Sequence, residues 1–358
     1  MTQRRPPGST WGDWGPDDTL GRLNLVGPEQ VRAGVAEVRD GRVFCLSLPL
    51  DRPRGVSLSP HRLPPVVRPT IRAGHVNFTC DLSVAVPGAT DVVSDDLVVL
   101  HTQFSTQWDA FGHIGARFDA DGDGEAEVLF YNGRRAGADV QGPAGTDDAG
   151  ASSLARLDGL ADGTASTSDA GPVDISHMAA HGAQGRGVLV DLEAHFGPGR
   201  RVVTGRDLEA VMRADDVTVE PGDFLLLHTG FARALLDDAA PTTGRHDGTP
   251  TVADRGAVLD GTDPDLHAWV RDSGVAAIAA DNHAVEAFPP TGHRPGTPAL
   301  PLHELCLFRL GVHLGELWWL SELAAHLRAA GRSRFLLTAP PLRLPRATGS
   351  PVTPVATT

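Results

Sequence analysis

The sequence predicts an α/β fold in a single domain that spans residues 1–358, and two kinds of segment in its second half carry this prediction. Apolar runs typical of short buried strands occur at 187–192, 224–230 and 275–281. Helical patterns occur between and after them, at 204–213, 266–273 and 317–330. Such alternation is typical of a sheet covered by helices. A chain of 358 residues is also long enough to bury a large core.

The first half of the chain is predicted to hold less regular structure. Residues 11–26 are expected to form an ordered loop, and a helix is expected at 28–40, where Pro28 and Glu29 suit a first helical turn. A strand is predicted at 41–50, a Pro-rich connection at 53–69 and a further strand at 95–109. Residues 141–172 are poor in large apolar side chains, which predicts a flexible surface excursion.

Composition excludes several classes of function. The net charge of −14 disfavours nucleic acid and anionic membrane surfaces as partners, since both need a basic patch. All 31 basic residues are Arg, so Schiff-base chemistry and a phosphate-loop lysine are excluded. Three scattered Cys residues, Cys45, Cys80 and Cys306, predict neither a disulfide framework nor a thiolate metal cluster. We therefore expect a soluble, cytoplasmic enzyme.

The segment QFSTQWDAFGH, residues 103–113, concentrates polar groups that can bind a metal or transfer a proton. If it follows a strand, side chains alternate between two faces. Gln103, Gln107 and Asp109 then share one face, while Phe104 and Trp108 lie on the other. Gly112 allows a tight bend, after which His113 can return over the same pocket.

This segment resembles the signature HxGTHxDxPxH of the cyclase-type metal-dependent hydrolases, whose members include bacterial kynurenine formamidase and isatin hydrolase. The resemblance places the family's acidic ligand on Asp109 and its final, proton-transferring His on His113. Its two ligand histidines fall on Gln103 and Gln107, and its Pro on Phe111.

The rest of the chain is also similar to the longer branch of this family, notably residues 11–31, 185–192, 221–230, 279–290 and 300–324. The resemblance places a downstream metal-site His on His303 and an acidic or amide ligand on Glu316. It implies a swivelling β/β/α fold with a mixed central sheet, and assembly as a homo-oligomer, a dimer or tetramer.

The amides at two ligand positions leave the cofactor open. A site of Gln103, Gln107, Asp109, His303 and Glu316 is rich in oxygen, which favours Mn²⁺ or Mg²⁺ over Zn²⁺ because neutral amides bind zinc less well than imidazole. The alternative is that no metal binds and the amides hydrogen-bond substrate or backbone. The cofactor prediction is a divalent metal, Mn or Zn, or otherwise none.

His113 is the predicted proton-transfer group, together with Asp109, because imidazole titrates near neutral pH. His283 and His313 are alternative histidines without a motif position. Aromatic and strand-end residues in the same motifs are the predicted substrate contacts, which suits a flat or cyclic small molecule: Phe104, Trp108, Phe111, Asp281, Asn282 and Trp318.

Three functions remain open from the sequence. The first is a hydrolase that cleaves or opens an amide, imide or lactone with water activated by a metal or by His113. The second is a metal-independent cyclase or lyase of secondary metabolism that works by acid and base catalysis. The third is a non-catalytic family member that binds a small molecule.

The C-terminal segment GSPVTPVA, residues 349–356, resembles the family's closing segment and carries Val352 and Val355 as apolar anchors. We therefore expect residues 350–356 to contact the folded domain or a partner subunit, beside the mouth of the pocket, although termini are usually solvated.

Overall fold

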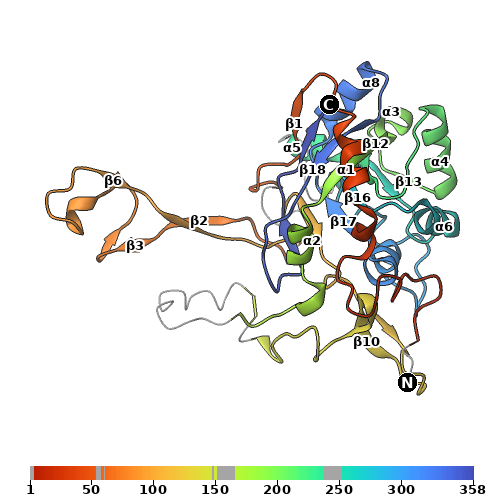
Figure 1. Ribbon diagram of the computed structural model, residues 1–358, viewed down its shortest axis with the longest axis horizontal. Helices are drawn as coiled ribbons and strands as arrows, with labels where there is room; N and C mark the ends of the chain where they lie inside the picture. The colour runs from red at the N-terminus through yellow and green to blue at the C-terminus, as the bar shows by residue number, and fades with distance from the viewer. Residues whose placement is uncertain (1–3, 54–57, 60, 147–148, 151–165, 238–251) are drawn as a thin grey trace, which may run out of the picture.

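A nine-stranded sheet forms the centre of the molecule, in the order β1-β20-β18-β12-β14-β16-β17-β8-β19. The computed structural model describes residues 4–53, 58–59, 61–146, 149–150, 166–237 and 252–358 (Figure 1). The four middle strands run parallel: β12 (Gln184–Asp191), β14 (Phe224–His228), β16 (Ala277–Ala280) and β17 (His313–Glu316).

The outer strands run antiparallel to their neighbours, so the sheet is mixed, as predicted. On one side lie β8 (Gln107–Asp109) and β19 (Gly349–Pro351). On the other lie β18 (Arg334–Thr338), β20 (Val355–Thr357) and β1 (Val43–Cys45).

Helices cover both faces of the sheet, which confirms the α/β prediction. One face packs against α4 (Gly205–Ala214), α6 (Pro264–Ser273) and the π-helix η8 (Glu304–Leu310). The other packs against α2 (Ser176–His181) and α8 (Ser321–Ala329). Helix α1 (Pro28–Val35) crosses β12 closely, because a Cβ at Gly34 would lie 2.7 Å from the carbonyl carbon of Gly185. The Thr204 side chain caps α4, as a helix start there predicts.

The remaining elements are short. They include α3 (Leu192–Phe196), α5 (Phe231–Leu236) and α7 (Pro301–His303), and the 3-10 helices η1 (Gly21–Leu25), η3 (Tyr131–Gly133), η6 (Gly171–Val173) and η7 (Val252–Asp254). A parallel pair joins β13 (Arg201–Val203) to β15 (Ala257–Leu259). A three-stranded sheet contains β9 (Ala116–Phe118), β10 (Glu127–Phe130) and β11 (Arg134–Arg135).

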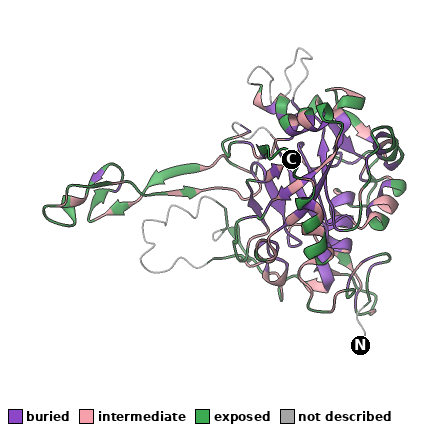
Figure 2. Ribbon diagram, turned by 45° about the horizontal axis from the view of Figure 1, so that its top comes forward, coloured by how far each residue is buried: buried purple, intermediate pink, exposed green. Residues whose placement is uncertain are grey.

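A long arm, residues 63–101, projects from the body (Figures 1 and 2). Its stem pairs β2 (Val66–Pro69) with β7 (Asp96–Val99). Its tip contains β3 (Ile71–Arg72), β4 (His75–Val76), β5 (Cys80–Asp81), η2 (Leu82–Val84) and β6 (Val92–Val93). The predicted connection at 53–69 and strand at 95–109 are therefore wrong in part: the first runs into the arm's stem, and the second is two strands in different sheets.

Other boundaries also differ from the sequence prediction. The helix expected at 28–40 ends at Val35, and the strand expected at 41–50 covers only 43–45. The helix expected from Leu317 starts at Ser321, because the backbone N–H groups of residues 317–319 bond to strand ends and to Leu46 instead. Much of the predicted excursion at 141–172 lies outside the described residues.

The C-terminal segment is part of the central sheet, which confirms that residues 350–356 contact the folded body. Strand β19 pairs with β8, placing Gly349 opposite Asp109, and β20 lies between β1 and β18. Within the described part of the chain, no helix combines the length and the apolar character needed to span a membrane.

Deleting residues 349–358 should therefore destabilise the protein severely. The deletion removes two strands and uncovers the partners of the buried Ser350, Val352 and Ala356. We expect a loss of more than about 3 kcal/mol in the free energy of unfolding, measured by chemical denaturation. The substitution Thr353→Ala, at an exposed position of the same segment, is the control and should leave stability unchanged. A truncated protein with wild-type stability would contradict the structural role.

Candidate functional site

The site starts on two strands that are neighbours only in the folded chain. Strands β8 and β17 pair so that Gln107 lies opposite Glu316 and Asp109 lies opposite Leu314. Side chains two residues apart share a face of a strand. Gln107, Asp109 and Glu316 therefore project into the same interior, and all three are buried. The structure thus brings Glu316 to Asp109 across about two hundred residues of sequence, as expected.

His303 completes this group from the short helix α7. Its Nε2 lies 3.3 Å from Oε1 of Glu316. One ligand atom each from Asp109, His303 and Glu316 falls within 4.8 Å of the others, and all three residues are buried. We call these three residues the acidic cluster.

Glu286, which was not predicted from the sequence, fixes the orientation of His303. Its Oε1 lies 2.8 Å from Nδ1 of His303 and accepts the backbone N–H of the same residue, while Oε2 accepts that of Leu302. Gly261 leaves room for this carboxylate, because a Cβ there would lie 1.8 Å from Oε2. The only sequence signal was its place in the segment 279–290, which resembles the family. A carboxylate on the second ring nitrogen is typical of metal-binding histidines.

Three oxygen atoms of the site have no hydrogen-bond partner although they are buried: Gln107 Oε1, Asp109 Oδ2 and Glu316 Oε2. A buried acceptor left without a partner costs about 1–3 kcal/mol, and more when it is charged. Three of them beside an imidazole nitrogen form a donor set that a divalent cation would satisfy. The residues present therefore fit a metal ion.

Burial and neighbouring charges shift the pKa values of all three residues in the acidic cluster. Burial, and next the charge of Glu316, raise the pKa of Asp109 to about 7. Burial also opposes ionisation of Glu316, but the hydrogen bond from His303 prevails and holds the pKa of Glu316 well below its usual range. Burial would lower the pKa of His303, yet its bonds to Glu286 and Glu316 raise it to about 10. The His303 imidazolium thus offsets the negative charge of Glu316.

His113 lies at the edge of the cluster. The chain turns back at Gly112, where a Cβ would lie 3.0 Å from that of Ala170. Nε2 of His113 is 4.0 Å from Oδ1 of Asp109. Burial, then the charges of His303 and Arg62, lower the pKa of His113 to about 4. The ring is therefore neutral at pH 7.

Gln103 does not share the strand geometry expected for it, because residues 100–106 lie outside β7 and β8. Its Nε2 approaches Nδ1 of His113 at 3.4 Å, and its Oε1 accepts a bond from Thr102. Gln103 is thus on the far side of the His113 ring from Asp109. By contrast, Gln107 contacts Asp109 directly, with its Nε2 3.3 Å from Oδ1.

A small cavity lies beside Gln103, and we call this cavity the mouth of the site. Its wall includes Arg62, Gln103, Phe104 and His283. The Arg62 guanidinium donates to the backbone oxygen of Gln103, and its charge acts on Asp109, His113 and Glu316. Arg62 was not anticipated from the sequence, where a single Arg among many carries no signal.

A family model described as "Putative cyclase" matches residues 46–287 of the chain. The chain belongs to this cyclase family. A crystal structure described as a novel cyclase matches with a TM-score of 0.69 and 29% sequence identity, over 98% of this chain and 99% of that one. No curated protein matches the chain.

Two isatin hydrolase structures have the same fold at low sequence identity, which confirms the predicted swivelling β/β/α type. Isatin hydrolase A from Labrenzia aggregata, bound to benzyl benzoate, matches with a TM-score of 0.52 and 14% identity, over 92% of this chain and 97% of that one. Isatin hydrolase A from Ralstonia solanacearum matches with a TM-score of 0.52 and 15% identity, over 91% and 94%.

In the cyclase fold, several of the residues predicted to contact substrate lie away from the acidic cluster. Trp108 and Trp318 pack against each other, with ring centroids 4.9 Å apart, in the core on the opposite face of the sheet. Phe111 stacks on His313, whose Nδ1 is 2.8 Å from the backbone oxygen of Asp109. Of the predicted aromatic contacts, Phe104 is the one that lines the mouth.

In the structure, the side chains of Asp281 and Asn282 form hydrogen bonds with backbone groups. The Asp281 carboxylate accepts bonds from the N–H groups of Thr229 and Gly230, which fixes the turn after β14. The Asn282 amide donates to the oxygen of Ala257. Neither residue lines the small cavity at the mouth.

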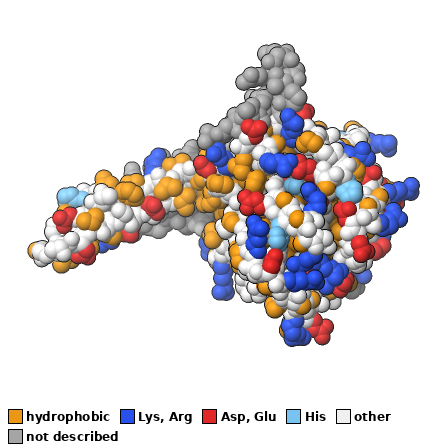
Figure 3. All heavy atoms as spheres, turned by 90° about the horizontal axis from the view of Figure 1, so that it is seen from above, with side chains coloured by type: hydrophobic (Ala, Val, Ile, Leu, Met, Phe, Trp, Pro, Cys, Tyr) orange, Lys and Arg blue, Asp and Glu red, His pale blue; other side chains and the backbone are white. Residues whose placement is uncertain are grey.

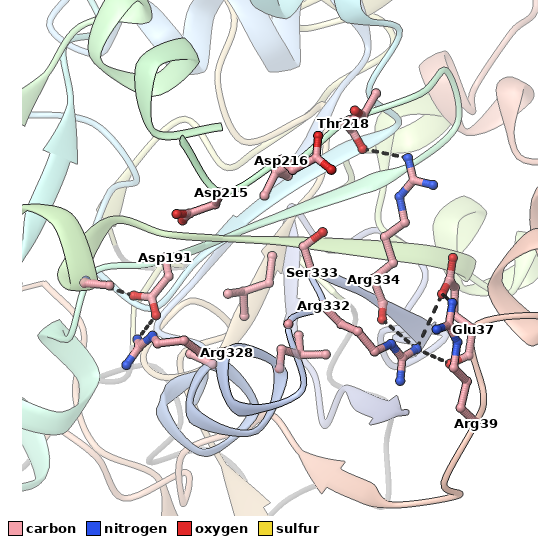
Figure 4. A pocket seen from close by; sticks show the side chains of 16 residues that line it. Glu37, Arg39, Asp191, Asp215, Asp216, Thr218, Arg328, Arg332, Ser333 and Arg334 are labelled. Carbon is pink, nitrogen blue, oxygen red and sulfur yellow. Dashed lines mark hydrogen bonds and ion pairs between the residues drawn. The ribbon is translucent and has the colours of Figure 1, made fainter. Parts of the chain in front are cut away.

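Two other features of the cyclase-family chain are less suited to metal binding or catalysis. A cavity of about 610 Å³ on the surface contains charges that already pair, Asp191 with Arg328 and Glu37 with Arg332 (Figure 4). A second acidic group, Asp119, Asp121 and Glu127, is partly exposed and has Arg135 at two of its carboxylates. The buried acidic cluster is the stronger candidate for a metal, because all three of its residues are buried and Asp109 Oδ2 and Glu316 Oε2 have no hydrogen-bond partner.

Proposed function

We propose that this cyclase-family protein is a metal-dependent hydrolase that cleaves or opens an amide, imide or lactone bond of a small, cyclic substrate. The observation that carries the proposal is the acidic cluster with three buried oxygens left without partners. The isatin hydrolase fold supports the same class of substrate, since isatin is itself a cyclic amide. We expect a cytoplasmic enzyme with no nucleic-acid partner.

Asp109, His303 and Glu316 would hold the cation, with the carbonyl oxygen of Gln107 beside them. This set contains three oxygens and one nitrogen, which favours Mn²⁺, with Zn²⁺ as the alternative. When bound, such a cation polarises a substrate carbonyl and lowers the pKa of the attacking water.

The chain's own residues supply the remaining functions. His113 is neutral at pH 7, and its Nε2 is close enough to the cluster to accept a proton from water and return it to the leaving group. Hydrolysis of an amide, imide or lactone produces a carboxylate. Arg62 at the mouth offers this anion a guanidinium partner.

A metal analysis combined with an activity assay tests the proposal. Protein purified without chelators should contain about one Mn or Zn ion per chain. It should hydrolyse members of a panel that contains isatin, cyclic imides and lactones, lose activity with a chelator, and recover it when the metal is returned. A chain free of metal and without turnover on any member would sink the proposal.

A second candidate, a metal-independent cyclase or lyase, is favoured by one observation. Two family ligand positions carry Gln, and His113 faces Asp109, whose pKa of about 7 suits proton transfer in both directions. Turnover that survives complete metal removal would support this candidate. Tight ligand binding without any turnover would instead indicate a binding protein.

Restoring a family histidine should affect the two Gln positions differently. Gln107→His places an imidazole beside Asp109 and should raise zinc affinity by about tenfold or more. Gln103→His should change it little, because His113 separates Gln103 from the cluster. Zinc titration of the metal-free proteins measures both effects, and equal gains at the two positions would contradict the geometry.

A further inference from the structure

Three side chains outside the acidic cluster are joined in a chain of hydrogen bonds. Nε2 of His228 lies 3.2 Å from Oγ of Ser321, and Nδ1 of the same ring lies 2.8 Å from Oδ1 of Asp191. A serine within roughly 3.2 Å of a base, with a third group that orients the base, is the arrangement that activates a nucleophile for covalent catalysis. The three residues thus have the order and the contacts of a catalytic triad.

The fold brings the three residues together at one edge of the central sheet. Asp191 and His228 are the last residues of β12 and β14, and they lie opposite each other in this parallel pair. Ser321 is the first residue of α8 and comes from a segment 93 residues further along the chain. Open α/β sheets bind their ligands beyond the carboxyl ends of parallel strands. This edge is therefore suited to a second site.

Burial separates the serine from its two partners. Asp191 is 8% exposed and His228 is 2% exposed, whereas Ser321 is partly exposed. The end of the body that carries α3 and α8 has basic and acidic side chains interspersed over its surface, so it is open to polar solutes (Figure 3). A shielded base beside an accessible hydroxyl is what a nucleophilic serine requires.

His228 can take a proton from the hydroxyl. Burial is the main cause that lowers the pKa of His228, so the ring is neutral at pH 7. Because an ionised carboxylate only accepts hydrogen bonds, Nδ1 carries the hydrogen toward Asp191, and Nε2 presents its lone pair to Ser321. Oε2 of Glu193, 3.6 Å from Nε2, favours the imidazolium that forms when the proton moves.

Asp191 is held in place by contacts on its other side. Its carboxylate accepts the backbone N–H of Ala194 and pairs with the Arg328 guanidinium (Figure 4). These contacts fix the carboxylate that orients His228. They do not involve the Ser321 hydroxyl, so the local structure does not need this hydroxyl, and its removal should leave the fold intact.

The start of α8 supplies donors for the negative oxygen of a tetrahedral intermediate. The residue before the helix, Leu320, offers no side-chain cap. The first backbone N–H groups of a helix have no partner inside it and carry partial positive charge. The N–H of Glu322, which directly follows Ser321, is one of them. An N–H in this position is a common member of an oxyanion hole.

We propose that Ser321, His228 and Asp191 form a second hydrolytic site, which cleaves carboxylic esters through an acyl-serine intermediate. Oγ of Ser321 bonds to the ester carbonyl carbon while its proton moves to Nε2 of His228. The bond to the alcohol oxygen then breaks, and this oxygen takes the proton. Water attacks the acyl-serine, gives a proton to His228 and releases the carboxylic acid as that proton returns to Oγ. This sequence of steps uses no metal and is independent of the acidic cluster.

The adjoining cavity indicates which esters fit. Ser321, Ala324 and Arg328 share one face of α8, and the last two line the surface cavity of about 610 Å³. Ala324 lies about 4.5 Å further along the helix than Ser321. Leu189 and Leu327 contribute apolar wall to this cavity. We therefore expect the acyl group of the ester to be a short aliphatic chain that lies against these leucines.

An active-site probe tests the second site on the full-length protein after treatment with a chelator. A fluorophosphonate labels a serine that a neighbouring base activates, and mass spectrometry of the digested protein locates the labelled residue. We expect the label on Ser321, and a burst of p-nitrophenol from p-nitrophenyl butyrate as the acyl-serine forms. Ser321→Ala should lose the label and lower ester hydrolysis by about a hundredfold or more.

Two further variants separate activation from exposure. His228→Gln keeps the serine but removes the base, and it should lose the label. Ser333→Ala is the matched control, because Ser333 lines the same cavity and lies outside the hydrogen-bonded three. It should keep both the label and the ester hydrolysis. Circular dichroism checks the folding of each variant.

The label on the wild type needs no variant, so a variant that folds poorly leaves this readout intact. A label on another residue, or none, would overturn the proposal. Ester hydrolysis that a folded Ser321→Ala variant leaves unchanged would do the same. Ester hydrolysis that appears only when the metal is returned would assign this reaction to the acidic cluster and also overturn it.

Discussion

Replacing Asp109 with Asn should abolish metal binding and, at the same time, stabilise the metal-free protein. The amide keeps the shape of the side chain and can still accept the bond from Gln107. It removes a buried negative charge that Glu316 repels. Metal content should fall to background in elemental analysis, and hydrolysis should fall with it, by about a thousandfold or more.

The stability gain should depend on pH in a defined direction. The pKa of Asp109 is about 7 in the folded chain and about 4 in an unfolded one. The folded state therefore retains a proton that the unfolded state has released, so wild-type stability falls as pH rises from about 4 to about 7. The Asp109→Asn variant does not lose stability over this pH range, because its amide does not titrate. Above pH 7 the metal-free variant should be more stable by on the order of 4 kcal/mol.

A buried aspartate outside the site is the matched control. Asp223 is buried and makes two hydrogen bonds to the Arg186 guanidinium. Asp223→Asn should destabilise the protein, since it breaks a buried pair, and should leave metal content unchanged. Chemical denaturation of chelator-treated proteins at several pH values measures both variants. Equal destabilisation by the two substitutions would show that Asp109 is an ordinary structural carboxylate.

The sequence predicted the α/β architecture because its second half consists of regular alternating segments. Strands β12, β14 and β16 are buried runs bounded by turn residues, and Thr204 marks the start of α4 with a side-chain cap. Local pattern is sufficient where a strand or helix is regular and buried on the expected face.

The arm was not predicted, for a physical reason. Its valines and isoleucine form the same pattern as a buried strand, yet they are exposed, because the side chains that hold its tip together are polar. Apolar periodicity reports which side chains avoid water. It does not report whether the chain itself or another molecule covers them.

Only part of the site was predicted from the sequence, because its residues come together only in the folded chain. The segment 103–113 itself indicated Asp109, whereas His303 and Glu316 could be assigned only through family resemblance, because both are remote from Asp109 in sequence. The pairing of Gln107 with Glu316 across β8 and β17 explains why the side chains of Asp109 and Glu316 lie close together. Glu286 and Arg62 escaped prediction because their roles arise from three-dimensional contacts, to His303 and at the mouth, that no sequence spacing encodes.

Replacing His113 with Ala should lower kcat by about a hundredfold to ten-thousandfold without loss of metal. His113 is outside the acidic cluster, so the three ligand atoms should keep their arrangement. Its neutral ring is placed to take a proton, with Nε2 4.0 Å from Asp109 and Nδ1 against Gln103. Removing it takes away the proton carrier and leaves the metal donors.

Chemical rescue separates proton transfer from a structural role. His113→Ala opens space at the mouth, and added imidazole should restore part of the lost kcat there if the missing group carried a proton. His293→Ala, at an exposed histidine outside the site, should show neither the loss nor the rescue. Steady-state kinetics on the most reactive substrate of the panel, with metal content determined for each protein, provides the measurement. Activity within a few-fold of wild type would remove His113 from the mechanism, because water alone would then suffice to transfer the proton.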